Sequence, residues 1–105
     1  MVERKKIIWG LIADKQLKKA LRFHLERTLS TNFSFKLLAE VEHALNLIEQ
    51  FNDIGTALPK TNFRSISVFM YSIVYEVAED HISILLFWDT RRNPKTLKIL
   101  LEELS

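Results

Sequence analysis

Three arginines and three aromatic residues are the side chains of this 105-residue chain whose types and spacing best suit binding chemistry. They are Arg64, Tyr71, Tyr75, Trp88, Arg91 and Arg92. A guanidinium group binds phosphate or carboxylate through paired hydrogen bonds, and an aromatic ring stacks on a base or fills a pocket in a partner. We therefore treat these six residues as candidates for contact with a target or partner macromolecule.

The arginines also have a structural interpretation. Arg64 falls in an expected strand, where it could pair with a nearby carboxylate such as Glu76. Arg91 and Arg92 follow another expected strand and could be solvated residues before a helix. If the strands form an antiparallel meander, the three guanidinium groups could instead gather on one edge of the sheet. There they would bind a phosphate or an acidic protein surface.

The aromatic candidates raise the same question. Tyr71 and Tyr75 share one face of an expected strand, where they could stack on bases or pack in the core. Trp88 ends another strand beside Asp89 and the arginines. Because such rings often anchor interfaces, it is the aromatic residue that we most expect to touch a partner, although it could equally cap the core.

Metal and cofactor chemistry has little support in the sequence. The chain has no Cys, and its three His residues, at positions 24, 43 and 81, are far apart. It shows no Gly-rich phosphate loop, no Ser-His-Asp arrangement and no paired-carboxylate motif. We expect no metal and no cofactor, and the sequence gives little support to the ordinary classes of enzyme.

The composition is that of one folded domain spanning residues 1–105, with 48% hydrophobic and 27% charged residues. No apolar run reaches the roughly 18 residues that a membrane span needs, so we expect no contact with a membrane. The absence of Cys fits a reducing cytoplasm. A net charge of +2 permits an acidic partner without implying one.

Two amphipathic helices are expected in the first half of the chain. Residues 5–12 predict a strand, and Asp14 is the expected N-cap of the helix that follows. A turn at residues 30–32 separates this helix from a second one, which runs to about Phe51 and forms a hairpin with the first. The first helix has an apolar stripe of Leu17, Ala20, Leu21, His24, Leu25, Thr28 and Leu29. Its basic outer side, which an acidic segment or a nucleic acid could contact, carries Lys15, Lys18, Lys19 and Arg22.

Three β-rich segments, 63–69, 71–78 and 82–88, follow a loop and predict an antiparallel meander. Asn93 and Pro94 then begin a short final helix with a leucine stripe. If side chains alternate strictly between the two faces, one face of the middle strand carries Tyr71, Ile73, Tyr75 and Val77. By the same alternation, one face of the last strand carries Ile82, Ile84, Leu86 and Trp88.

The order β-α-α-β-β-β-α predicts an α+β fold, with an N-terminal strand, a helical hairpin, a three-stranded antiparallel meander and a short C-terminal helix. A helical hairpin covers only one face of a sheet, yet neither face of the last strand is polar. Either the final helix folds back over the second face or a partner chain covers it.

Four segments, in order and spacing, resemble the ParE/RelE superfamily of bacterial toxins. They are 48–55 (IEQFNDIG), 71–77 (YSIVYEV), 81–85 (HISIL) and 91–94 (RRNP), with Arg64 between the first two. The similarity covers roughly residues 6–95 and is closer to ParE-like members, described as plasmid stabilisation toxins. It implies the RelE/ParE-like fold and a type II toxin-antitoxin system, in which a cognate antitoxin protein wraps the toxin and holds it inactive.

The resemblance implies two targets, since RelE-like members cut messenger RNA on the ribosome and ParE-like members poison DNA gyrase. Ribonuclease members carry a basic residue where this chain has Ser72, and some end in a His-Tyr pair that is absent here. We therefore expect a non-catalytic inhibitor with gyrase as its target, and leave catalytic residues unassigned.

Two alternatives remain open at this point. In a ribosome-dependent ribonuclease, Arg64, Arg91 and Arg92 would stabilise charge, and Tyr71 or His81 would take part in proton transfer. In an inactive relative, the scaffold would serve as an interaction module, for example as a homodimer through its last helix.

Overall fold

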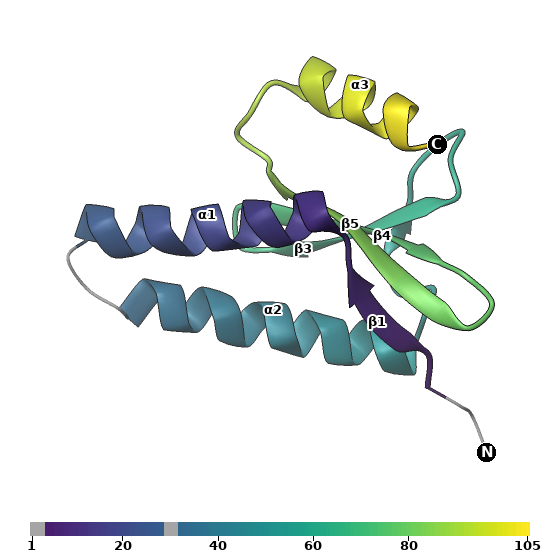
Figure 1. Cartoon of the computed structure of the whole chain (residues 1–105), viewed down its shortest axis with the longest axis horizontal. Coiled ribbons are helices and arrows are strands. Elements are labelled where there is room, and N and C mark those ends of the chain that lie inside the picture. The colour runs from purple at the N-terminus through teal and green to yellow at the C-terminus, as the bar shows by residue number, and fades with distance from the viewer. Residues whose placement is uncertain (1–3, 29–31) are drawn as a thin grey trace.

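A five-stranded sheet with helices on both faces forms the part of the chain that the computed structural model describes, residues 4–28 and 32–105 (Figure 1). The predicted α+β class, with strand, helical hairpin, meander and final helix in that order, is confirmed. The elements are β1 (Lys6–Trp9), α1 (Leu11–Thr28), α2 (Asn32–Gln50), β2 (Thr56–Ala57), β3 (Phe63–Val68), β4 (Tyr71–Val77), β5 (His81–Asp89) and α3 (Pro94–Leu104).

The strand order is β1-β5-β4-β3-β2. Strands β3, β4 and β5 form the predicted antiparallel meander, and β1 lies parallel to β5 at the edge. Strand β2 was not predicted, because its two residues lie in a segment rich in turn formers and form a strand only by pairing with β3.

The boundary between β1 and α1 lies earlier than the sequence indicated. Gly10 extends the pairing by donating its N–H to the carbonyl of Ile84 at 2.8 Å, and its own carbonyl accepts from the N–H of Asp14 at 3.0 Å. A Cβ at Gly10 would lie 2.9 Å from the Ile84 oxygen, so this close approach requires glycine. Asp14 therefore lies in the first turn of α1, and the prediction that it caps the helix was wrong.

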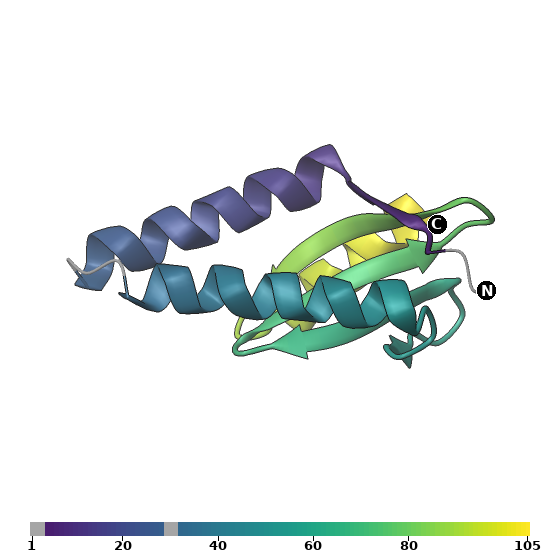
Figure 2. The ribbon, with the colours of Figure 1, turned by 90° about the horizontal axis from the view of Figure 1, so that it is seen from below.

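Helices α1 and α2 run side by side as the predicted hairpin and cover one face of the sheet (Figure 2). The predicted turn at Ser30 and Thr31, and the stripe residue Leu29, lie outside the described residues. Burial of the apolar stripes supplies most of the stabilisation here, since removal of apolar surface from water dominates folding. The buried side chains between the hairpin and the sheet include Leu17, His24, Leu37, Val41, Ile48, Tyr71, Ile73, Tyr75, Ile82 and Ile84.

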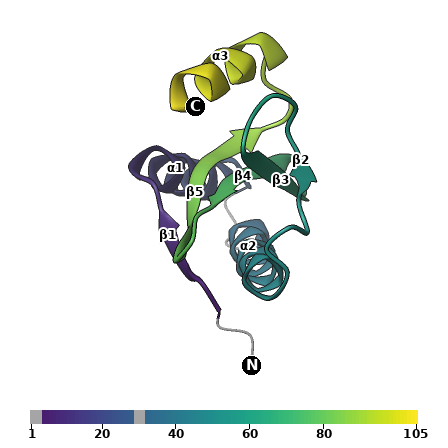
Figure 3. The same cartoon turned by 90° about the vertical axis from the view of Figure 1, so that its right-hand side faces the viewer.

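Helix α3 lies against the opposite face of the sheet (Figure 3). Asn93 caps it through a side-chain oxygen that accepts from the N–H of Lys95 at 2.9 Å, as the Asn-Pro pair predicted. Its stripe of Leu97, Leu100, Leu101 and Leu104 covers the buried side chains of Phe63, Val74 and Leu86. The second face is thus covered from within the chain, although no residue of α3 is itself buried.

A bulge in β5 breaks the predicted alternation. Val74 pairs with Leu86 but the next residue, Tyr75, pairs with Ile84, so Leu85 is an extra residue without an opposite partner. Ile84 therefore faces the hairpin while Leu86 faces α3. The prediction that one face carries both of them was wrong, because the extra residue reverses the side-chain direction beyond it.

Candidate functional site

Arg64 and Tyr75 lie at one end of the meander, where they hold the loop that follows α2. The Arg64 guanidinium donates to the carbonyls of Gly55 at 2.8 Å and Asp53 at 3.2 Å. The Tyr75 hydroxyl donates to the carbonyl of Asn52 and accepts from the N–H of Gly55, both at 2.9 Å. Arg64 thus binds backbone carbonyls and not the carboxylate of Glu76, so that expected ion pair was wrong.

Gly55 is required where this loop meets the sheet. A Cβ at this position would lie 2.7 Å from the Tyr75 hydroxyl and 2.8 Å from the carbonyl oxygen of Ser65. Tyr75 itself is fully buried, and this burial raises the pKa of its hydroxyl. The arrangement therefore closes the loop onto the sheet and leaves this tyrosine no surface for stacking on a base.

Arg91 and Arg92 lie at the other end of the meander. Arg91 forms a bidentate ion pair with Asp89, with its Nε 2.9 Å and its Nη2 2.7 Å from the two carboxylate oxygens. This contact lowers the pKa of the Asp89 carboxyl. Arg64 lies opposite Tyr75 on β4, whereas Asp89, the partner of Arg91, lies opposite Tyr71. These two β4 residues are four apart, which is about 13 Å at 3.3 Å per residue. Arg64 therefore does not gather with the other arginines, contrary to the prediction.

Trp88 is buried, with 1% of its surface exposed. The guanidinium of Arg92 covers its ring, with the Cζ atom 4.6 Å from the ring centroid. In this conformation the ring packs in the domain and presents no face to a partner. Of the two interpretations of Trp88, the geometry supports the one in which it caps the core.

Tyr71 forms a buried polar pair with His24. The His24 Nε2 atom lies 2.8 Å from the Tyr71 hydroxyl, and the tyrosine ring stacks on Phe87 at 4.6 Å between centroids. Burial, with Arg91 second, lowers the pKa of His24, and burial raises the pKa of Tyr71. Both groups are therefore held neutral near neutral pH, as a core hydrogen bond requires.

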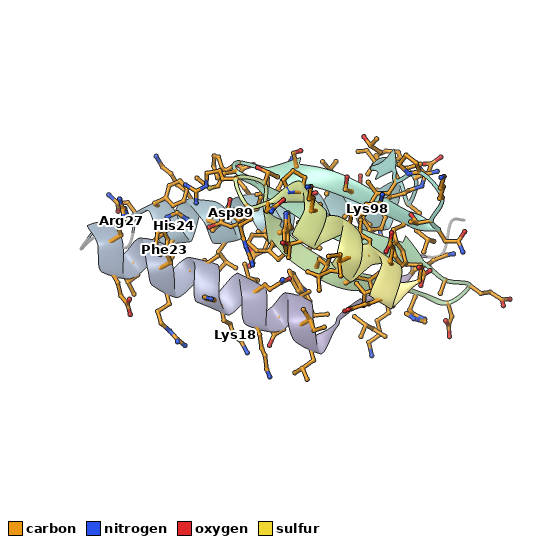
Figure 4. All side chains as sticks on the ribbon, turned by 90° about the horizontal axis from the view of Figure 1, so that it is seen from above. Lys18, Phe23, His24, Arg27, Asp89 and Lys98 are labelled. Atoms are coloured by element: carbon orange, nitrogen blue, oxygen red, sulfur yellow. The ribbon has the colours of Figure 1, made fainter. Side chains whose placement is uncertain are left out.

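A cleft of about 220 Å³ opens beside this pair, between α1 and the end of β5. Figure 4 shows Phe23 and His24 on α1 next to Asp89. The α1 residues that line the cleft are spaced by three and four, so they share one face of the helix. The lining consists of Gln16, Lys19, Ala20, Phe23, Tyr71, Phe87, Asp89, Arg91 and Arg92.

The structure brings together only part of the predicted set. Tyr71, Arg91 and Arg92 line the cleft, with Trp88 directly behind Arg92, whereas Arg64 and Tyr75 are remote. Sequence reasoning missed Gln16 and Phe23 as site residues. The one available signal was the basic outer side of α1, which includes Lys19.

The side chains that line the cleft suit an anionic group. The cleft combines an apolar floor with three cations and one carboxylate.

Within residues 4–28 and 32–105, no group of three or more His, Cys, Asp or Glu side chains converges to hold a metal ion. In the same ranges, every helix is too short or too polar to cross a lipid bilayer.

Comparison with known proteins identifies the fold and then the family. A solved structure described as the chromosomal ParDE TA system from P. aeruginosa matches with a TM-score of 0.64 and 17% sequence identity, covering 80% of this chain and 94% of that one. No curated protein sequence matches. The family model of the ParE toxin of the type II toxin-antitoxin system, parDE, matches residues 7–94. The chain therefore belongs to the ParE toxin family.

Proposed function

We propose that this chain is a growth-inhibiting toxin that acts in the cytoplasm on DNA gyrase and is neutralised by a cognate antitoxin protein. The observation that carries the proposal is the family match over residues 7–94, which includes both the helical hairpin and the whole meander. The similar solved structure is itself described as a ParDE TA system, which supports an antitoxin as the partner.

The positions of the cationic groups favour an inhibitor that acts by binding over one that cleaves RNA. Cleavage needs cations that stabilise developing charge beside an acid or base that can reach the substrate. Arg64 is engaged with loop carbonyls, Arg91 with Asp89, and the Tyr71 hydroxyl with buried His24. Ser72 stands where ribonuclease members carry a basic residue and lies opposite Trp88.

Induced expression in a bacterium tests this proposal. The chain is expressed alone and together with any short reading frame adjacent to its gene, and growth, plasmid supercoiling and messenger RNA integrity are measured. We expect growth arrest with loss of supercoiling, relieved by the neighbouring product. Messenger RNA cleavage with intact supercoiling would instead establish the ribonuclease, and normal growth in every arm would establish an inactive interaction module.

A further inference from the structure

The cleft beside Tyr71 is held open by a contact between α1 and the edge of β5. Strand β1 pairs with β5 only as far as Ile84, and the carbonyl of Ile84 accepts from Gly10 before the chain turns into α1. Beyond that point the Gln16 side-chain oxygen accepts from the N–H of Phe87 at 2.8 Å. This side chain satisfies the backbone of β5, so the helix and the strand hold the cleft in a fixed geometry.

The floor of the cleft is apolar and partly accessible. Phe87 and Tyr71 are buried at 3% and 4% exposure, Ala20 at 8%, and Phe23 at the rim is 44% exposed. A half-exposed phenylalanine beside a cavity of this size is a surface on which an apolar side chain of another molecule can be buried.

The rim of the cleft carries an uncompensated positive charge. Lys19 forms no ion pair with any residue of the described ranges, and Arg92 contacts the Trp88 ring. The third cation, Arg91, is already neutralised by Asp89. Lys19 and Arg92 are therefore available to carboxylates of a ligand, and Asp89 competes with such a ligand for Arg91.

We propose that this cleft binds an acidic peptide segment of the partner protein, with an apolar side chain between Phe23 at the rim and Phe87 on the floor, and with flanking carboxylates at Lys19 and Arg92. This inference rests on the proposed function, because the segment would belong to the antitoxin. The charge of the rim and the apolar floor together call for a ligand that is both acidic and hydrophobic.

A nucleic acid is the other anionic ligand, and the cleft suits it less well. The Asp89 carboxylate lies among the three cations and would repel a phosphodiester backbone. Tyr71, one of the two tyrosines considered for stacking on bases, is covered by His24 and Phe87. A peptide can place its carboxylates at Lys19 and Arg92 and keep them away from Asp89.

Fluorescence anisotropy with a designed probe tests the proposal. The probe is a short, end-capped, fluorescein-labelled peptide with one central Phe flanked by Glu and Ser residues. Two control peptides replace Phe with Ala or every Glu with Gln. We expect the full probe to bind and each control peptide to bind about tenfold or more weakly. Equal binding of all three, or no binding of the full probe, would overturn the proposal.

Three protein variants locate the binding. Lys19→Glu should weaken binding of the probe about five- to tenfold, since it reverses a rim charge. Asp89→Asn should tighten it, because the substitution removes the internal competitor for Arg91. Lys15→Glu makes the same charge change on an exposed part of α1 outside the cleft and should have little effect. A loss with Lys15→Glu as large as that with Lys19→Glu would overturn the proposal.

Two further measurements complete the test. In a titration followed by amide NMR, the N–H of Phe87 should shift while that of Gly55 stays unchanged; the reverse would place the peptide elsewhere. A single-stranded oligonucleotide that displaces the probe at equal concentration would establish the nucleic-acid ligand instead.

Failure here is distinguishable from failure of the proposed function. If the neighbouring product relieves growth arrest equally well from the wild-type chain and from the Lys19→Glu variant, the toxin role stands and the cleft is not where the partner binds. If the wild-type chain causes no arrest, the proposed function fails, whatever the peptide does.

Discussion

Two tyrosines on the same face of β4, Tyr71 and Tyr75, have opposite surroundings. The Tyr75 hydroxyl bonds to two backbone groups of one loop, and the Tyr75 side chain is 0% exposed. The Tyr71 hydroxyl bonds to one side chain, His24, and its ring lines a cleft with cations at the rim. Both rings are buried, and burial raises the pKa of both hydroxyls.

The difference separates a structural end of the sheet from an end suited to binding. At the Tyr75 end, the polar groups of the loop and sheet satisfy one another, so the contacts serve to fix the chain. At the Tyr71 end, Lys19 and Arg92 remain available at the surface. Substitutions at the first end should therefore change stability, and substitutions at the second should mainly change binding.

Tyr75→Phe should have the largest effect on stability. It removes two hydrogen bonds and leaves the buried N–H of Gly55 without its partner, which should cost about 2–3 kcal/mol in the free energy of unfolding. Urea denaturation of the variant and the wild-type chain measures this loss. A change below about 0.5 kcal/mol would show that the loop is held by other contacts.

Tyr71→Phe should be milder, since only the bond to His24 is lost and the ring still stacks on Phe87. We expect about 1 kcal/mol in the same denaturation experiment. The contrast with Tyr75→Phe matters more than either value. If the Tyr71 variant were the less stable of the two, the assignment of structural and binding ends would be reversed.

The pH dependence of stability should reveal His24 at the Tyr71 end. Its pKa is lowered in the fold from 6.5, chiefly by burial, so below pH 6.5 the unfolded chain binds a proton that the folded chain does not. Stability should therefore fall as pH decreases below 6.5 toward the lowered value. His24→Gln, which keeps a hydrogen-bonding side chain but does not titrate, should flatten this slope, and an unchanged slope would exclude His24 as its source.

Arg92→Ala should have the smallest effect on folding. The cation–π contact with Trp88 is at the surface of the domain, and its loss should cost about 0.5–1 kcal/mol. The same substitution should weaken binding of the acidic peptide severalfold. A variant with normal binding and a large loss of stability would place Arg92 with the structural residues.

Local patterns were sufficient to predict most of the fold. Turn-forming residues between short β-rich segments predicted the meander. Apolar residues spaced by three and four predicted the hairpin and the final helix. The errors arose where distant segments meet. The chain turns from β1 into α1 at Gly10, which approaches the carbonyl of Ile84 too closely for a Cβ, and Leu85 is an extra residue in the pairing of β5 with β4. Each depends on how one strand pairs with another, which the residue types within a single segment do not specify.

The candidate site was predictable only in part for the same reason. Arg91 and Arg92 stand out as neighbours in sequence, but Gln16, Lys19 and Phe23 join them from a helix some 70 residues earlier. Arg64 was grouped with the other arginines because a meander brings strands together. The register, which decides at which end of the strands each residue lies, could not be predicted from residue types.

The most direct test of the contrast between a structural Tyr75 end and a binding Tyr71 end is hydrogen exchange. It is measured on the chain alone and in complex with the product of the neighbouring reading frame. We expect binding to protect the amides of residues 16–23 in α1 and of residues 86–92 at the end of β5, with no change at residues 52–55. Protection confined to residues 52–55, with none in α1 or at the end of β5, would contradict the assignment of the cleft as the partner's site.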